Sequence, residues 1–174
     1  GTGRGAENGI LIKGGESLET AHKIDTIVFD KTGTLTAGKP SVTDIITNGK
    51  IEADELLKLA ASAEAGSEHP YGLAIVAKAQ EKEIKPYDIE EFKVFPGHGI
   101  KAKIKGMTIL MGNEKKMSEE GINLSGFKEK PAPLDFKKVA DELSSHGKTP
   151  MYVAINSEMA GIIAVADTLK KDSI

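Results

Sequence analysis

IVFDKTGTLT, residues 27–36, is the stretch that decides the expected fold. It continues a run that begins at residue 25, DTIVFD, which is short, almost wholly apolar and rich in β-branched side chains. Such a run is typical of a strand that is buried on both faces of a parallel sheet. Ligands of open parallel sheets bind beyond the carboxyl ends of the strands. Asp30, which ends the run, is therefore expected to lie at a ligand site.

The turn that follows Asp30 carries groups that can hold a phosphoryl group. Gly33 and the neighbouring threonines offer backbone N–H groups and hydroxyls, and Lys31 adds a positive charge. A carboxylate in this place can attack phosphorus and become an aspartyl phosphate. An isolated Asp-x-x-Gly more often caps a turn, but the full DKTGTLT after an apolar strand is far more specific. Asp30 is therefore a candidate nucleophile.

The pattern of the sequence changes after residue 36. TAGKP, residues 36–40, contains Gly and Pro and is predicted to be a linker. Beyond it, alternating strands, helical spacing of apolar residues and tight turns predict an antiparallel sheet flanked by helices. Strands are expected at 41–47, 89–99, 100–106, 107–113, 150–156 and 158–166, helices at 53–65, 70–83, 114–121 and 134–147, and a polar loop at 125–133.

These patterns predict an α+β domain that is inserted in an incomplete α/β, Rossmann-like domain. The predicted boundaries place residues 1–36 and 165–174 in the α/β domain and residues 37–164 in the insert. The chain opens without Met, and we expect it to be an excised part of a longer protein.

Composition excludes several kinds of function. The 174 residues carry a net charge of -3, so a basic footprint for nucleic acid is absent and no nucleic-acid partner is expected. The chain has no cysteine, which excludes disulfides and thiolate catalysis. The longest apolar run, AGIIAVA at 160–166, is too short to cross a bilayer.

A second group of motifs lies within residues 61–113: ASAEAGSEHPYG, PGHGI and MGN. Taken alone, the Glu-His-Pro of residues 68–70 also fits a helix N-terminus that is capped by His69. GHG alone is more often a turn than a binding site. The three motifs together are much more specific than any one of them.

Both groups of motifs resemble the heavy-metal-transporting P-type ATPases. DKTGTLT resembles their phosphorylation motif, and residues 61–113 resemble their nucleotide-binding domain, where Ser-Glu-His-Pro replaces the aromatic-lined pocket of other pumps. The resemblance covers essentially the whole chain. It implies a nucleotide-binding domain with an antiparallel sheet, inserted in an incomplete haloacid-dehalogenase-like phosphorylation domain.

In that family the Asp of the motif accepts the γ-phosphoryl group of ATP, which implies that Asp30 is catalytic. The resemblance also implies that Asp30 and the main-chain carbonyl of Thr32 hold Mg²⁺. The related dehalogenase-like phosphatases carry a second Asp, as general acid and base, where this chain has Thr32. The loss of that proton shuttle suits a pump, because the acyl phosphate must persist long enough to drive a conformational change. The residues implied to support the phosphate are Lys31, Thr32, Gly33 and Thr34.

The resemblance implies seven nucleotide-binding residues in the insert. His69 would orient the adenine base, and Glu64 would accept a hydrogen bond from its exocyclic amine. Two glycines would let the backbone approach the nucleotide where a Cβ would clash, one apolar residue would form a wall, and two further residues would contact ribose or phosphate. These are, in that order, Gly97 and Gly99, Ile100, and Gly112 and Asn113.

The chain is thus expected to be the ATP-binding cytosolic portion of a copper-transporting P-type ATPase, an integral membrane protein. Its expected partners are ATP and the remaining phosphorylation, actuator and transmembrane domains; a copper chaperone could serve the parent pump. The transported ion, expected to be Cu⁺, is not bound by this chain. The family's Thr-Gly-Asp segment, phosphate-site lysine and Gly-Asp-Gly-x-Asn-Asp loop are missing from the sequence. We therefore expect nucleotide binding with little turnover.

Three alternatives to a copper pump differ from it in the transported ion or in the reaction. Copper is favoured because AHKI, residues 21–24, looks most like copper-transporting members, and a zinc or cadmium pump of the same family is the first alternative. A soluble dehalogenase-like phosphatase is the second, although Thr32 and the large insert argue against it. A non-catalytic docking module is the third.

Three further features carry weaker signals. His98 is expected to be exposed and not to bind a ligand. Lys101, Lys103 and Lys105 alternate along one strand face, which favours a solvated face over a triphosphate track. ADTLKKD, residues 166–172, resembles the segment that returns the chain to the phosphorylation domain, and Asp167 is expected at a second strand end of the parallel sheet.

Overall fold

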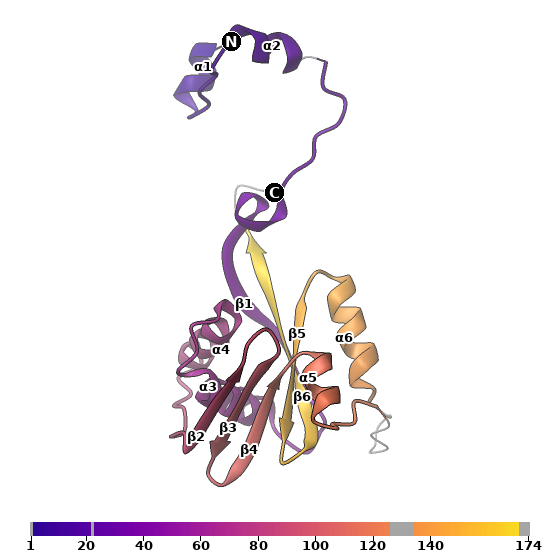
Figure 1. The fold of residues 1–174 in the computed structure, drawn as a ribbon. Coiled ribbons are helices and arrows are strands. Elements are labelled where there is room, and N and C mark those ends of the chain that lie inside the picture. The colour runs from indigo at the N-terminus through magenta and orange to yellow at the C-terminus, as the bar shows by residue number, and fades with distance from the viewer. Residues whose placement is uncertain (1, 22, 126–133, 171–174) are drawn as a thin grey trace.

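A sheet with helices on both faces forms the body of the protein, and an N-terminal segment extends away from it (Figure 1). The computed structural model describes residues 2–21, 23–125 and 134–170. The sheet has six strands in the order β1-β6-β5-β4-β3-β2, and every neighbouring pair is antiparallel. The strands are β1 (Thr36–Thr47), β2 (Glu91–Phe95), β3 (Gly99–Ile104), β4 (Met107–Gly112), β5 (Thr149–Ile155) and β6 (Glu158–Leu169).

The sheet has a hydrophobic core on each face. Successive residues of β4 point to opposite faces, so Ile109 and Met111 pack with α3 while Leu110 packs with α6. Burial on both faces fixes the strand register, because a slip of one residue would exchange the two sets. One face is covered by α3 (Ala53–Glu64) and α4 (Pro70–Glu81), the other by α5 (Glu114–Glu119) and α6 (Phe136–Ser145). The predicted antiparallel sheet flanked by helices is confirmed.

Local sequence signals place the turns and one helix start. Lys105 and Gly106 join β3 to β4, and Asn156 and Ser157 join β5 to β6, all four with positive φ. Two consecutive residues with positive φ form the tight turn that matches the twist of paired strands. Pro70 takes the first position of α4, where a missing N–H loses no helical hydrogen bond. The predicted loop at 125–133 lies, except for Ser125, outside the described residues.

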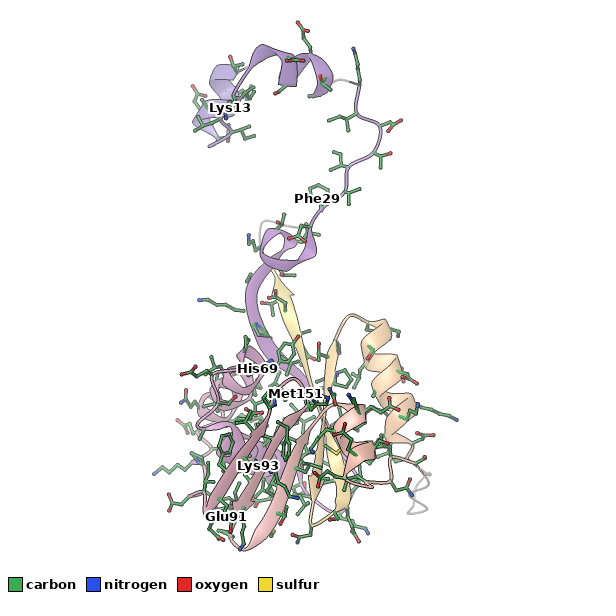
Figure 2. All side chains as sticks on the ribbon, viewed as in Figure 1. Lys13, Phe29, His69, Glu91, Lys93 and Met151 are labelled. Atoms are coloured by element: carbon green, nitrogen blue, oxygen red, sulfur yellow. The ribbon has the colours of Figure 1, made fainter. Side chains whose placement is uncertain are left out.

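The predicted parallel strand at residues 25–30 is wrong: this segment has no regular secondary structure. Ile27, Val28 and Phe29 are exposed, and Figure 2 shows Phe29 apart from the body of the protein. A strand inside a parallel sheet needs hydrogen-bonding partners, and no strand of the described residues pairs with this segment. The elements around it are α1 (Thr2–Glu7), α2 (Gly15–Ala21) and the π-helical turn η1 (Lys31–Leu35).

The junction between the motif and the sheet is a strand pair and not a linker. β1 begins at Thr36 and pairs with β6, with Pro40 opposite Asp167. Asp167 accepts hydrogen bonds from the Thr36 hydroxyl at 2.5 Å and from the Lys39 backbone N–H at 3.0 Å. It therefore lies within an antiparallel pair, and the predicted place at the end of a parallel strand is wrong. Both predicted domain boundaries fall within this strand pair, and they stay predictions.

The helices of the body are short. In the described part of the chain, no helix has the length and apolar content needed to cross a bilayer.

Candidate functional site

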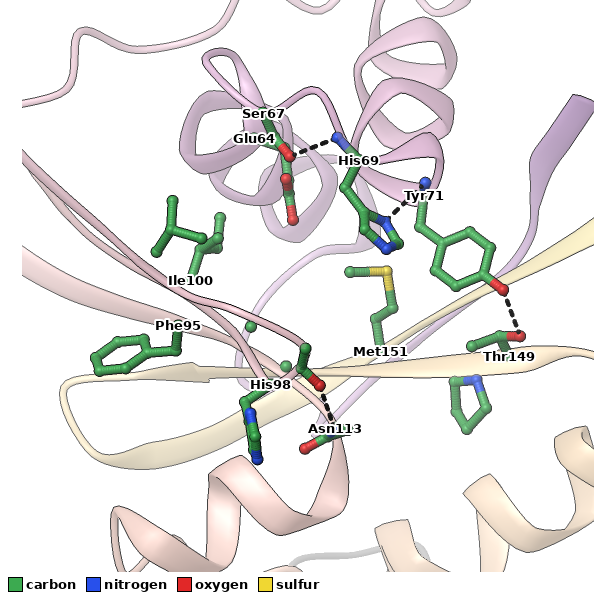
Figure 3. Close-up of a pocket in the computed structure, with 15 residues that line it drawn as sticks. Glu64, Ser67, His69, Tyr71, Phe95, His98, Ile100, Asn113, Thr149 and Met151 are labelled. Carbon is green, nitrogen blue, oxygen red and sulfur yellow. Dashed lines mark hydrogen bonds between the residues drawn. The ribbon is translucent and has the colours of Figure 1, made fainter.

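A cleft of about 280 Å³ opens between the helical layer and one end of the sheet (Figure 3). Its helical wall comes from the end of α3 and the start of α4, and its other walls come from the β2–β3 turn, the end of β4 and the start of β5. All seven predicted nucleotide-binding residues line it: Glu64, His69, Gly97, Gly99, Ile100, Gly112 and Asn113. The structure thus brings together residues that are up to 49 positions apart in the sequence. Their binding role stays a prediction.

Glu64 places a buried carboxylate at this cleft. The residue is 4% exposed, and its Oε2 atom has no hydrogen-bond partner among the described residues. Burial raises the pKa of the Glu64 carboxyl, and a hydrogen bond from Ser67 and the nearby His69 act in the opposite direction. A buried polar atom without a partner costs about 1–3 kcal/mol. The lining position and the unpartnered oxygen together make the Glu64 carboxylate a candidate acceptor for a hydrogen-bond donor.

His69 both caps α4 and faces the cleft. Its Nδ1 accepts a hydrogen bond from the Tyr71 backbone N–H at 3.3 Å, and the backbone N–H of His69 donates to the Ser67 hydroxyl at 3.2 Å. Because Nδ1 accepts, the neutral ring carries its proton on Nε2. The ring packs edge-on against Tyr71, with 5.0 Å between centroids. Helix capping and ligand binding therefore do not exclude each other, since the cap leaves Nε2–H free to donate.

Two of the predicted glycines are required by strand packing as well as by any ligand. Gly99 and Gly112 are paired across β3 and β4. A Cβ on Gly99 would lie 2.0 Å from the Met111 carbonyl oxygen, and one on Gly112 would lie 2.3 Å from the His98 carbonyl oxygen. A Cβ on Gly97 would meet nothing within 4 Å, although its φ is +72°. The neighbouring strand thus requires glycine at positions 99 and 112, and the positive φ favours it at position 97.

Asn113 holds the β2–β3 turn against α5. Its Oδ1 accepts from the Lys116 backbone N–H at 2.9 Å, which caps α5, and its Nδ2 donates to the Gly97 carbonyl at 3.2 Å. Ile100 is 5% exposed and contributes an apolar wall from β3. Asn113 thus shapes the cleft through the turn in addition to any contact with a ligand.

Sequence reasoning missed part of the lining. His98 is half-buried and lines the cleft, with Nδ1 2.8 Å from the Pro96 carbonyl oxygen, so the expectation that it is simply exposed is wrong. Tyr71 follows the Ser-Glu-His-Pro motif and could have been included from its position. The β5 residues had no local signal, because the sheet order brings them to the cleft. The missed residues also include Phe95, Thr149, Pro150 and Met151.

The three alternating lysines contact residues that do not line the cleft. Lys101 pairs with Glu120 at 3.2 Å, Lys103 pairs with Glu91 at 3.5 Å, and the Lys105 ammonium lies 3.7 Å from the centre of the Tyr87 ring. None of the three lysines lines the cleft. These contacts agree with the solvated face that the sequence favoured.

The predicted phosphorylation loop lies outside the cleft. Asp30 and Thr34 are exposed, and neither lines the cleft. Gly33, with a φ of +80°, donates its N–H to the Thr36 hydroxyl at 3.2 Å and accepts at its carbonyl from the Lys170 ammonium at 2.5 Å. The loop is thereby fixed to both strands of the β1–β6 pair. The structure does not describe the side chains of the two residues between Asp30 and Gly33.

The predicted magnesium ligands lie in this loop. Mg²⁺ is usually held by one or two carboxylates together with substrate phosphates and water. Asp30 can supply one carboxylate, but the described residues contain no group of three or more His, Cys, Asp or Glu side chains that could hold a metal ion. Because Mg²⁺ does not require three such side chains, the predicted ligands, Asp30 and the carbonyl of Thr32, stay a prediction.

Comparison with known proteins identifies the kind of protein to which this fold and cleft correspond. A model of the haloacid dehalogenase-like hydrolases matches residues 24–174. A copper-exporting P-type ATPase of Staphylococcus saprophyticus is 47% identical over 170 residues, which are 98% of this chain and 20% of that protein. The chain thus spans about a fifth of the length of the curated relatives it matches.

Solved structures of P-type ATPases also match this chain. The crystal structure of a zinc-transporting PIB-type ATPase in the E2.Pi state matches with a TM-score of 0.73 and 39% identity, over 94% of this chain and 25% of that one. A structure of the catalytic domain of the CPx-ATPase CopB-B, described for its conformational changes upon nucleotide binding, matches with a TM-score of 0.62 and 29% identity, over 92% and 51%. These matches confirm the predicted fold class and the resemblance to P-type ATPases.

Proposed function

Because the chain belongs to the haloacid dehalogenase-like hydrolases, we propose that it is the ATP-binding cytosolic portion of a metal-transporting P-type ATPase. The observation that carries the proposal is Glu64, a buried carboxylate that lines the cleft and whose Oε2 has no hydrogen-bond partner among the described residues. Adenine offers the matching group, because its exocyclic amine is a hydrogen-bond donor. His69 lies on the same wall and can donate from Nε2–H to a ring nitrogen of the base.

The rest of the cleft suits the remainder of a nucleotide. Ile100 and Met151 provide apolar contact for the base, and Gly97 leaves open space with its backbone exposed. The cleft volume of about 280 Å³ is near the lower end of the range for small-molecule sites. A volume of this size suits the nucleoside, with the phosphates directed out of the cleft.

In the complete pump, Asp30 would be the phosphate acceptor. A carboxylate oxygen of Asp30 would bond to the γ-phosphorus of ATP, the bond from that phosphorus to the β–γ bridging oxygen would break, and ADP would leave. Lys31, Gly33 and Thr34 would support the transferred group, and Mg²⁺ would neutralise phosphate charge. Both the Mg²⁺ site and the phosphate contacts would require groups from further parts of the pump.

The transported ion and the partners follow from the relatives. The names of the curated relatives specify copper export, whereas one matched structure is of a zinc transporter. Copper is therefore our first proposal and zinc or cadmium the alternative. The partners would be ATP and the remaining phosphorylation, actuator and transmembrane domains, with this chain on the cytosolic side of the membrane.

We expect His69→Gln to weaken ATP binding about tenfold, the effect of losing one hydrogen bond and the ring contact. Calorimetric titration with ATP would measure the change. His146→Gln is the matched control, because His146 also lies at a helix end and does not line the cleft. Full affinity in His69→Gln, with the fold intact, would remove the adenine role from His69.

The family match is also compatible with a second function, that of a soluble phosphatase of the dehalogenase-like type. Rapid phosphate release from a simple phosphoester, abolished by Asp30→Asn, would favour it. The exposed and unsupported position of Asp30 argues for the pump fragment, which should release phosphate at close to the uncatalysed rate.

A further inference from the structure

We propose that Gly72 is a positioning residue for base recognition, because its missing side chain leaves the space that the Glu64 carboxylate occupies. The inference rests on the proposed function of the cleft and adds a residue that does not line it. Gly72 lies in the first turn of α4 and is buried against the end of α3.

The geometry leaves no room for a side chain at position 72. A Cβ on Gly72 would lie 2.3 Å from Glu64 Oε2, 2.9 Å from Glu64 Cδ and 2.9 Å from the Ser67 hydroxyl oxygen. Atoms that are not bonded do not approach a Cβ this closely, so one of the groups must move. The atom in closest conflict is the same oxygen that has no hydrogen-bond partner within the part of the chain that the structure describes.

Helix formation gives no reason for glycine here. Gly72 has no positive φ, so alanine is compatible with its backbone conformation. Glycine is the weakest helix former apart from proline, and alanine is the strongest. The sequence therefore keeps an unfavourable helix residue at a position of α4 that faces the Glu64 carboxylate.

The conflict would be relieved by side chains and not by the backbone. All three atoms near the added Cβ belong to the side chains of Glu64 and Ser67, whose ends can rotate. At Gly99, by contrast, all three nearest atoms belong to the backbone of Met111 and Gly112. We therefore infer that Gly72→Ala moves the base-recognising carboxylate while the fold survives.

The experiment compares the affinities of ATP and ITP, because inosine has an oxo group where adenine has its exocyclic amine. The unaltered chain should prefer ATP about tenfold, the effect of one hydrogen bond to a charged group. Gly72→Ala should lose most of that preference by weakening ATP binding, with ITP affinity changed less than about twofold. Gly66→Ala is the matched control, since a Cβ there meets nothing within 4 Å, and it should retain the preference.

A second background shows whether Gly72 acts through Glu64. In a Glu64→Ala chain the conflict with the carboxylate is gone and only the contact with the rotatable Ser67 hydroxyl remains. Adding Gly72→Ala to that chain should therefore leave ATP affinity unchanged and should not lower the unfolding temperature. A Gly72→Ala chain that keeps both the ATP affinity and the preference for ATP would overturn the inference. If the unaltered chain binds no ATP, the proposed function is itself wrong and the inference falls with it.

Discussion

Gly99→Ala is expected to destabilise the fold by about 3–5 kcal/mol, the range of the largest single-residue effects. The added Cβ would lie 2.0 Å from the Met111 carbonyl oxygen and 2.6 Å from the Gly112 Cα. These are backbone atoms of the paired strand β4, so the conflict can be relieved only by separating β3 from β4. The φ of +146° adds strain for any residue with a side chain. Urea unfolding, followed by circular dichroism, measures the loss.

Gly97→Ala is the matched control for Gly99→Ala. Gly97 also has a positive φ, but a Cβ there meets nothing within 4 Å. We expect a loss of about 1–2 kcal/mol from the backbone conformation alone. Equal stability of the two variants would mean that the close approach of β3 and β4 is not what requires glycine at position 99.

Glu64→Gln is expected to stabilise the fold at pH 7 and to weaken ATP binding by about 10- to 100-fold. The affinity loss follows from removing a charged acceptor, because a hydrogen bond to a charged group is worth about 1.5–3 kcal/mol. The gain in stability follows from removing a buried carboxylate whose Oε2 has no hydrogen-bond partner among the described residues. We expect the thermal midpoint to rise by about 2–4 °C, the shift that 1 kcal/mol gives for a chain of this size.

The effect on stability should depend on pH in a defined direction. Burial raises the pKa of Glu64 above its ordinary value of 4.5, so the folded state keeps this proton to a higher pH than the unfolded chain does. The protonated form therefore contributes stability that is fully present below pH 4.5 and is lost as the pH rises through the raised pKa. The advantage of Glu64→Gln should accordingly shrink as the pH falls toward 4.5.

Glu68→Gln is the matched control for Glu64→Gln, because Glu68 is exposed, lies four residues away and does not line the cleft. It should change neither stability nor ATP affinity. If Glu64→Gln lowers the thermal midpoint at pH 7, the buried carboxylate is paired in solution and the argument from its free oxygen is wrong.

Local chemistry made much of the fold predictable. The turns at 105–106 and 156–157 and the start of α4 at Pro70 depend on residues that are adjacent in sequence, and they lie at the ends of the predicted strands and helix. The strand expected at 25–30 depends on partners that no local pattern supplies, so its apolar side chains are exposed here. Asp167 was misplaced for the same reason, because its hydrogen bonds come from β1.

The residues of the candidate site also differ in whether a local motif or the pairing of distant strands brings them to the cleft. Glu64 and His69 were found because they lie within one compact motif, and the structure adds that Glu64 is buried and that His69 caps a helix. Met151 was missed because the antiparallel pairing of β4 and β5 brings it to the cleft. The close approach at Gly99 was also invisible, because it depends on the carbonyl of Met111 across the strand pair.

The central claim is that this cleft binds ATP, and a titration followed by backbone amide shifts tests it most directly. ATP would be added to isotope-labelled protein while the amide resonances of the whole chain are recorded. We expect saturable shifts at Glu64, His69, Gly97, Gly99 and Asn113, with little change at α6, which does not line the cleft. Shifts that avoid these five residues, or no saturable shifts at all, would contradict it.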